Sequence, residues 1–463
     1  MPPPPAPGTK PVSLLRWIAP LAIAFVLAAI TGRLSVHHVN DSPSYLNYPF
    51  DSLRQAMLSI RPPVYPIFLR LAESSLGVAI VPLLQACMHA IACVCFGEEL
   101  RRRGLSDRAS LVAAFTVLAG CTATDHISTI STDAPAASLG VLTATLLMRT
   151  SRTGGLASSV GCGLAALLCI FARPAYLFLV PWVAIAGWML NRCDRRRRLP
   201  AAADGRRGLW IATHVGGVIL IWMSCRAFIV HDFSFLPFGH QNLSAVAAQL
   251  VSPDDMRRYA GDAAPATGEL LRRVADDLER GDFRLPESAE ASIPTLTLES
   301  QWGQINYGVI WPAAKAVGQR SADLDSETPD RVRVHRLIGD FNRTIIANAP
   351  LAYARWIVLA IRRSVWGSLA NLAMHPLFLA MILVAIAWLL VRSASGSTIT
   401  LPPFAAGWYG FAIIALTYCI GSVGLVILTS PPIGRFADAA AIFLPGLLAS
   451  PLIGDTTKPS APR

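Results

Sequence analysis

Long apolar runs separated by short charged segments make up most of the chain. Many of these runs reach the roughly 20 residues that a helix needs to cross a hydrocarbon layer about 30 Å thick. We therefore expect an all-α polytopic membrane protein. The pattern predicts about ten spanning helices, near residues 14–32, 76–97, 108–123, 132–148, 155–171, 174–190, 209–230, 375–391, 405–428 and 437–453.

The position of the arginines predicts the orientation of these helices. Clusters such as Arg101-Arg102-Arg103 and Arg195 to Arg198 fall in loops that share one side of the membrane if the N-terminus is cytoplasmic. Connections on the other side hold few basic residues, as the positive-inside rule requires. We expect both termini in the cytoplasm, and the protein in the cell inner (plasma) membrane.

Two segments on the extracytoplasmic side are too long for simple connectors, residues 33–75 and 231–371. Long ordered loops usually carry function. In the second segment, a helix is predicted near Pro253 to Arg280, because Ser252 can cap it, Pro253 fits its first turn and two Asp residues follow. A second helix is predicted to start at Thr328-Pro329-Asp330. This segment should form a mostly helical loop domain.

The stretch Leu351 to Leu369 mixes apolar residues with three Arg and two Trp residues. That mixture favours a helix lying along the lipid interface. A short eleventh span is the competing interpretation, but it would change which side the last helices face. The charge of the loop 392–400 argues against it.

These features divide the chain into five parts, each with its own expected environment. They are a disordered cytoplasmic tail (1–13), an N-terminal membrane module with seven spans and the first outside loop at 33–75 (14–230), an extracytoplasmic loop domain with an interfacial helix (231–371), a C-terminal membrane module with three spans (372–453), and a second cytoplasmic tail (454–463).

Composition agrees with a membrane protein and excludes some other classes. Apolar residues make up 53% of the chain and charged residues only 15%, unlike most soluble domains. The net charge of +11 is bunched between apolar runs, so it indicates topology and not a nucleic-acid partner. The nine cysteines show no paired spacing, and most fall in apolar runs, so we expect neither disulfides nor a cysteine metal site.

Several short motifs lie at the extracytoplasmic ends of the predicted spans. Asn40-Asp41-Ser42-Pro43-Ser44-Tyr45 follows the first span, and Ile60-Arg61-Pro62-Pro63-Val64-Tyr65-Pro66 precedes the second. Ser131-Thr132-Asp133, Ala172-Arg173-Pro174 and Gly434-Arg435-Phe436 stand beside later spans. Together they resemble the GT-C glycosyltransferases that use polyprenyl-phosphate sugars, the group of the bacterial protein-mannosyl and aminoarabinose transferases. Members of that group often have Glu at the position of Asp133 and Arg-Tyr in place of Arg435-Phe436.

The resemblance implies a GT-C-like membrane enzyme that moves a sugar from a polyprenyl-phosphate donor to a lipid, glycan or protein acceptor. Such a reaction needs a base near the acceptor hydroxyl and cations that hold the departing phosphate. Asp41 is the candidate catalytic base. The candidate substrate-binding residues are Tyr45, Arg61, Tyr65, Asp133, Arg173 and Arg435.

Each of these residues also has a purely structural interpretation. Asp41 precedes Ser-Pro and suits a turn, and Arg61 suits a side chain that reaches to lipid headgroups. Arg173 and Arg435 break the positive-inside pattern, which calls for a local partner such as a structural ion pair or a headgroup. Asp133 stands near a helix start, where the helix dipole favours an acid.

A divalent cation is the one candidate cofactor. Asp125, His126 and Asp133 lie near the same outside connection, and with Asp41 they could supply oxygen ligands to a hard cation. The alternative, which we favour, leaves Asp125 and His126 as solvated loop residues.

Two other functions remain open at this stage. One is a transporter or flippase of a lipid-linked or small polar solute, although few charges lie mid-span and no internal repeat is evident. The other is a ligase or polymerase that joins whole lipid-linked glycans, which would share the cationic outer face. No nucleotide-binding loop is present, which disfavours an enzyme that uses nucleotide sugars.

Overall fold

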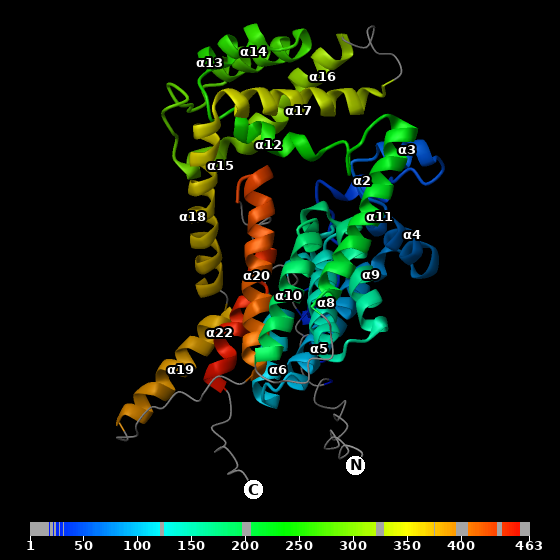
Figure 1. Cartoon of the computed structure of the whole chain (residues 1–463), viewed down its shortest axis with the longest axis vertical. Coiled ribbons are helices and arrows are strands. Elements are labelled where there is room, and N and C mark those ends of the chain that lie inside the picture. The colour runs from blue at the N-terminus through cyan, green and yellow to red at the C-terminus, as the bar shows by residue number, and fades with distance from the viewer. Residues whose placement is uncertain are drawn as a thin grey trace.

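The chain forms a helical bundle beneath a separate layer of helices (Figure 1). The computed structural model describes residues 32–120, 125–196, 205–320, 328–374, 376–394, 406–432 and 438–453, with a few positions between 18 and 30. Within these ranges nearly all regular structure is helical, apart from an isolated parallel bridge between His37 and Thr129. The all-α class predicted from the sequence is therefore confirmed.

Most bundle helices coincide with predicted apolar runs, and one covers the stretch 351–369 that was predicted to lie at the interface. The bundle helices are α5 (Val81–Arg102), α6 (Asp107–Leu118), α8 (Asp133–Thr153), α9 (Leu156–Ala172), α10 (Leu179–Arg196), α11 (Arg207–Val230), α18 (Pro350–Met374), α19 (Pro376–Ala394), α20 (Ala406–Thr429) and α22 (Leu444–Ile453), with short 3-10 turns η1 (Val78–Ile80), η2 (Pro174–Tyr176) and η5 (Asp438–Ala441). Four stretches of the described chain are long and apolar enough to cross a membrane: Val78–Arg102, Pro174–Arg196, Arg207–Val230 and Gly407–Thr429. The count of about ten spans stays a prediction, and the first span lies mostly outside the described residues.

Aromatic side chains fill the bundle core. The rings of Phe96, Phe411 and Phe443 meet at centroid distances of 5.4 and 5.0 Å, and Tyr418 joins them from α20. Because these residues come from α5, α20 and the start of α22, the C-terminal helices pack inside the N-terminal group. The two predicted membrane modules therefore share one hydrophobic core.

An ionic network lies at the end of the bundle that is remote from the upper layer. Arg103 is 7% exposed and bonds Asp194 at 3.1 Å and the Met148 carbonyl at 2.8 Å. Arg152 forms a two-pronged pair with Glu99 at 2.7 and 2.9 Å. Arg103 and Arg152 therefore hold α5, α8 and α10 together. The sequence pattern had indicated only which side of the membrane such arginines face.

The upper layer, which we call the cap (residues 239–348), has a hydrophobic core of its own. Its helices are α12 (Gly239–Ala247), α13 (Pro253–Asp262), α14 (Pro265–Arg280), α15 (Thr295–Gln304), α16 (Trp311–Arg320) and α17 (Asp330–Asn348), with a π-helical turn η3 (Ile305–Ile310). Ser252 and Asp255 form the capping box that starts α13. The helix predicted from Pro253 to Arg280 is instead two helices, broken before Pro265, because proline disfavours helical backbone in the residue that precedes it.

Helix α18 leaves the cap through a sharp corner and runs beside α20 (Figure 1). The angle between α17 and α18 is 98°. The Tyr353 hydroxyl, near the start of α18, donates to the Leu428 carbonyl, near the end of α20, at 3.0 Å, so the two helices are antiparallel. Ala352, Trp356 and Ala360 are buried at a spacing of four residues. This arrangement suits a spanning helix better than the interfacial helix predicted for 351–369.

Helix α19 does not follow the bundle axis. It runs obliquely away from the end of the bundle opposite the cap (Figure 1). We therefore expect an exchange of roles, in which α18 crosses the membrane in place of the predicted span at 375–391 and α19 lies along the far surface. The exchange keeps the number of predicted spans and the relative sides of the last helices.

The exchange gives a topology prediction. We expect an epitope inserted after Met374, at the end of α18, to be accessible from the face opposite to an epitope inserted after Glu287 in the cap, because α18 would cross the membrane between them. Antibody access in sealed vesicles of both orientations measures this. Access to both epitopes from one face would favour the interfacial helix.

Two histidines stack where α12 meets α17, with His335 buried and His240 on the exposed side. The rings of His240 on α12 and His335 on α17 lie 4.4 Å apart and are inclined by 18°. Burial lowers the pKa of both imidazoles, and for His335 the neighbouring His240 lowers the pKa further. Charges around the stack act in both directions: Asp232 and Asp340 raise the pKa of one or both rings, whereas Arg226, Arg336 and Arg343 lower it.

The stack predicts that the cap loses stability in acid. An unfolded histidine takes up a proton near pH 6.5. The folded pair resists protonation, so the folded chain binds fewer protons, and stability should be full above that pH and fall below it. For the buried His335 the slope is about 1.4 kcal/mol per pH unit, and the exposed His240 adds less because solvent screens it. Histidine changes its charge between about pH 5 and pH 8. Thermal unfolding of the full chain across that range measures the slope. A His335→Phe variant keeps a stacked ring and should show a shallower slope; an unchanged slope would contradict this origin.

Candidate active site

The first outside loop folds against the connection that precedes α8. The backbone N–H of His37 donates to the Ser128 carbonyl at 2.8 Å, and that of Ile130 donates to the His37 carbonyl at 3.0 Å. The Ser42 hydroxyl then donates to the Ile130 carbonyl at 2.8 Å. These bonds fix the start of the short helix α2 (Ser42–Leu46), whose first residue follows Asp41. The position of Asp41 is therefore set by two segments that are far apart in the sequence.

Asp41 and Arg61 form the ion pair at the centre of this loop. The Arg61 guanidinium bonds the Asp41 carboxylate at 2.7 Å and the Ser44 hydroxyl at 2.8 Å. It also lies 4.5 Å from the centre of the Tyr45 ring. The side chains of Asp41 and Arg61 are 33% and 19% exposed, so the pair is open to solvent on one side. Pro62 and Pro63 fix the chain between the pair and α4 (Val64–Leu76).

Two tyrosines and a glutamine form the floor beneath that pair. Tyr45 and Tyr65 meet edge to face at 5.1 Å, and the Tyr45 hydroxyl lies 3.4 Å from the Thr132 hydroxyl. The Tyr65 hydroxyl donates to the side-chain carbonyl of Gln85 at 3.3 Å. The Gln85 amide in turn donates to the Ile127 carbonyl at 2.7 Å. Burial raises the pKa of Tyr65, so its phenol stays a neutral donor.

A second ion pair joins Asp133, at the start of α8, to Arg173, at the end of α9. Asp133 opens α8, and Arg173 follows α9 in an extended conformation that the next residue, Pro174, favours. The Arg173 guanidinium donates to the Asp133 carboxylate. The carboxylate side chain is 2% exposed and the arginine 13%, so Asp133 lies behind Arg173. Thr132, the partner of Tyr45, precedes Asp133 and links the two pairs.

A third ion pair joins the first outside loop to the connection that precedes α8. Asp125 bonds Arg33 at 3.2 Å, and both side chains are well exposed. Asp41, Asp125 and Asp133 thus each pair with a different arginine. Among the residues that the structure describes, no three His, Cys, Asp or Glu side chains gather in a way that could hold a metal ion.

Arg226 joins the loop to the bundle and to the start of the cap connection. Its side chain is fully buried at the end of α11 and bonds the Met57 carbonyl, on α3 (Leu53–Leu58), and the Asp232 carboxylate. It also donates to the Ser234 carbonyl at 2.9 Å. The hub formed by Arg226 and Asp232 therefore holds the loop, α11 and the cap connection in one arrangement.

Comparison with solved structures gives two similar chains, both of ArnT from Cupriavidus metallidurans. One is bound to undecaprenyl phosphate and the other is in the apo state. Each is 12% identical to this chain; the alignments cover 94% of this chain and 76% and 77% of ArnT, with TM-scores of 0.35 and 0.37. A likeness this distant transfers no residue and no substrate to this chain.

No protein-family model matches the chain, and no curated protein matches it. The functional interpretation therefore depends on the geometry of the loop and its neighbours.

The structure gathers six of the seven residues singled out from the sequence. Asp41, Arg61 and Tyr45 are in direct contact, Tyr65 packs on Tyr45, and Asp133 with Arg173 follows through Thr132. Arg435 lies outside the described residues. Tyr45 and Tyr65 are 3% and 1% exposed, so they form the floor of the site and offer little surface to a bound molecule.

Sequence reasoning missed Gln85 and the Arg226–Asp232 pair. Gln85 is a single amide within an apolar run, and it holds both Tyr65 and the loop before α8. A polar side chain in a predicted span is itself a signal of a buried partner. The partners of Arg226 are not deducible from spacing, because Met57 is 169 residues away in the chain.

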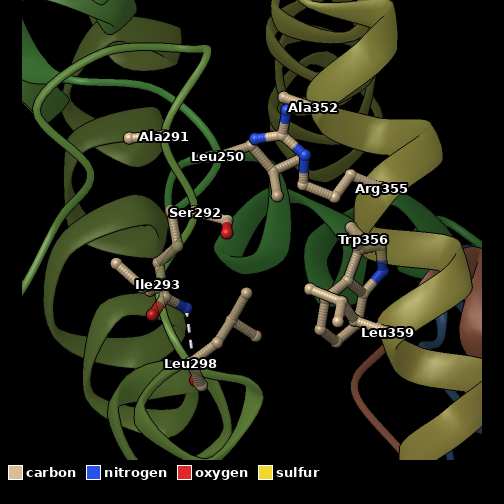
Figure 2. Close-up of a pocket in the computed structure, with 10 residues that line it drawn as sticks. Leu250, Ala291, Ser292, Ile293, Leu298, Ala352, Arg355, Trp356 and Leu359 are labelled. Carbon is tan, nitrogen blue, oxygen red and sulfur yellow. Dashed lines mark hydrogen bonds between the residues drawn. The ribbon is translucent and has the colours of Figure 1, made fainter.

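A small cavity lies where the cap meets α18 (Figure 2). Its volume is about 20 Å³, enough for one water molecule. Figure 2 shows Trp356 and Leu359 of α18 on one side and Ile293 and Leu298 of the cap on the other, with Arg355 above them. Arg355 donates to the Glu290 carbonyl. This cavity belongs to the junction and is too small for a substrate.

Proposed function

We propose that this chain is a membrane glycosyltransferase that moves a sugar from a polyprenyl-phosphate donor to a hydroxyl acceptor. The observation that carries the proposal is the Asp41–Arg61 pair, partly exposed on a loop that is bonded at both sides to the bundle. Its position at the cap end of the apolar bundle is where a lipid phosphate could present its headgroup. The motif resemblance to the GT-C family supports the same reaction.

The arginines supply what a departing phosphate requires. Arg61 and Arg173 are both partly exposed, and each is held in place by a carboxylate. A guanidinium presents several N–H donors in a fixed plane, which matches phosphate oxygens. In this proposal they hold the phosphate while the bond from its oxygen to the anomeric carbon breaks. Asp133 is a positioning residue, because it is buried behind Arg173.

Asp41 acts as the base in this proposal. The acceptor hydroxyl attacks the anomeric carbon and its proton passes to the Asp41 carboxylate. The bond to Arg61 orients that carboxylate, and the larger exposure of Asp41 leaves it accessible to an acceptor. Tyr45 and Tyr65 support the pair from below as positioning residues.

The test is sugar transfer by the full-length chain in proteoliposomes. With an undecaprenyl-phosphate sugar and an extract of membrane acceptors, we expect release of undecaprenyl phosphate and a labelled product heavier by one sugar. Movement of the intact donor across the bilayer, without release of the phosphate, would support a flippase in its place. Products that carry long glycans would support a ligase or polymerase.

A further inference from the structure

A polar cavity of about 220 Å³ lies between α2, the turn that follows it and one face of α4. By the same measure a single water needs about 10–15 Å³, so the cavity can hold a much larger molecule. Aromatic and charged side chains dominate its lining: Tyr45, Tyr48, Phe50, Asp51, Arg70 and Glu73. We infer that it receives a sugar, or a polyol of similar chemistry, that forms the headgroup of the acceptor; this inference rests on the proposed function.

Two aromatic side chains of the cavity wall, Tyr48 and Phe50, have defined contacts. The Tyr48 hydroxyl donates to the Ala56 carbonyl at 3.3 Å, and Tyr48 is 7% exposed. The Arg70 guanidinium lies 4.6 Å from the centre of the Phe50 ring, so these two side chains hold each other. Such walls need little ordering when a ligand binds, which favours binding.

The charged groups of the lining are available to a ligand. The side chains of Asp51, Arg70 and Glu73 make no hydrogen bond or ion pair with other described residues. Among those residues, the contact of their charged groups is that of Arg70 with the Phe50 ring. Carboxylates accept from sugar hydroxyls, and a guanidinium donates to sugar oxygens. The Phe50 ring, which is half-buried, adds apolar surface against the C–H face of a sugar. The combination suits a ligand with many hydroxyls better than an acyl chain.

Helix α4 places the cavity near the lipid. Leu69, Arg70 and Glu73 share the face that lines the cavity, as residues three and four apart do. Ile67 and Leu71 lie on the outward face and are 45% and 63% exposed. A helix with one polar and one apolar face suits the membrane surface. The acceptor headgroup would therefore enter at the depth of the lipid headgroups.

One aromatic ring separates the cavity from the Asp41–Arg61 pair. Tyr45 lines the cavity and also carries the Arg61 guanidinium on its ring. To reach Asp41, a hydroxyl of the bound headgroup has to extend past the Tyr45 ring. The cavity thus lies beside the proposed chemistry and does not overlap the arginines assigned to the donor phosphate.

Photo-crosslinking in cells captures the occupant of the cavity whatever its identity. Phe50 is replaced by p-benzoylphenylalanine in the full-length chain, and adducts are analysed by mass spectrometry. As the control, p-benzoylphenylalanine replaces Phe228, which is 85% exposed near the C-terminal end of α11. We expect sugar-bearing adducts at position 50 and none at 228; an attached lipid tail would show that the headgroup is membrane-anchored. Sugar-free lipid adducts, or the same adducts at both positions, would overturn the inference.

The rates of sugar transfer and donor hydrolysis provide a second, independent test. With donor and acceptor extract present, the combination Asp51→Asn and Glu73→Gln is expected to lower the ratio of transfer to donor hydrolysis by about tenfold or more. Glu287→Gln, which removes one exposed carboxylate charge in the cap, should leave that ratio unchanged. An unaltered ratio in the double variant overturns the acceptor cavity alone. A wild-type chain that consumes no donor overturns the proposed function, whatever the crosslinks show.

Discussion

Replacing Asp41 by Asn is expected to lower the rate of sugar transfer by about 10²–10⁴-fold, the contribution typical of a general base. The amide keeps the shape of the side chain but cannot take a proton from the acceptor hydroxyl. Release of undecaprenyl phosphate from a sugar-loaded donor, in proteoliposomes of the full-length chain, measures the rate. An Asp41→Asn variant as active as the wild type would remove Asp41 from the chemistry.

The matched control is Asp125→Asn. Asp125 is also a loop carboxylate bonded to an arginine, but its pair with Arg33 is exposed and apart from Tyr45. Loss of an exposed pair costs about 0–1 kcal/mol, so its activity should stay close to that of the wild type. A large loss there would show that charge on the loop, and not the base, controls the rate.

The Arg61→Ala variant separates the roles within the pair. Arg61 contacts Asp41, so combining Arg61→Ala with Asp41→Asn should cost less activity than the sum of the two single losses. If the arginine also holds the donor phosphate, Arg61→Ala alone should raise the KM for the donor. Strict additivity of the two losses would indicate that the ion pair has no part in orienting the base.

The second large effect is expected from Arg226→Ala, which should destabilise the fold by about 3–5 kcal/mol. The change leaves the Asp232 carboxylate buried without its cation and the Met57 and Ser234 carbonyls without a donor. Thermal unfolding in detergent measures the loss. Arg320→Ala is the control, because Arg320 forms a pair with Glu269 in which the side chains are 62% and 38% exposed.

Removing both charges tests the cause of that loss. Buried ion pairs are often replaceable by apolar side chains of similar size at little cost. The combination Arg226→Met and Asp232→Leu should therefore recover part of the stability lost in Arg226→Ala. An Arg226→Ala chain as stable as the Arg320→Ala control would show that the hub contributes little.

Much of the bundle follows from local features of the sequence. Apolar length identified the helices, and the capping residues at Ser252 and Asp255 marked the start of α13. Thr328-Pro329-Asp330 likewise marked the start of α17. These features act within one or two turns, so the sequence displays them directly.

The expected exchange of roles between α18 and α19 does not follow from composition. Both helices are apolar, and the three arginines of α18 favoured the interface. Arg363 bonds Glu299 of α15 at 3.1 Å, and Tyr353 bonds the end of α20. These partners are 64 and 75 residues away, so no local pattern reveals the contacts of Arg363 and Tyr353.

In the candidate site, too, some residues follow from local motifs and others depend on contacts between distant segments. Asp41, Tyr45 and Arg61 were identified because the motifs that hold them are short and close in sequence. The paired state of Arg173 depends on Asp133, forty residues earlier, and was one of two open interpretations. Gln85 contacts both the loop and the connection before α8, and such convergence appears only when the helices are assembled.

The corner between α17 and α18 also limits how this protein can be rearranged by recombination. Ala352, Trp356 and Ala360 of α18 belong to the hydrophobic core of the cap, together with Ile427 of α20. A graft of residues 239–348 onto another bundle would leave that core open on one side. The smallest exchangeable module is therefore the cap with α18 attached, so a change of cap between related proteins would have to carry a bundle helix with it.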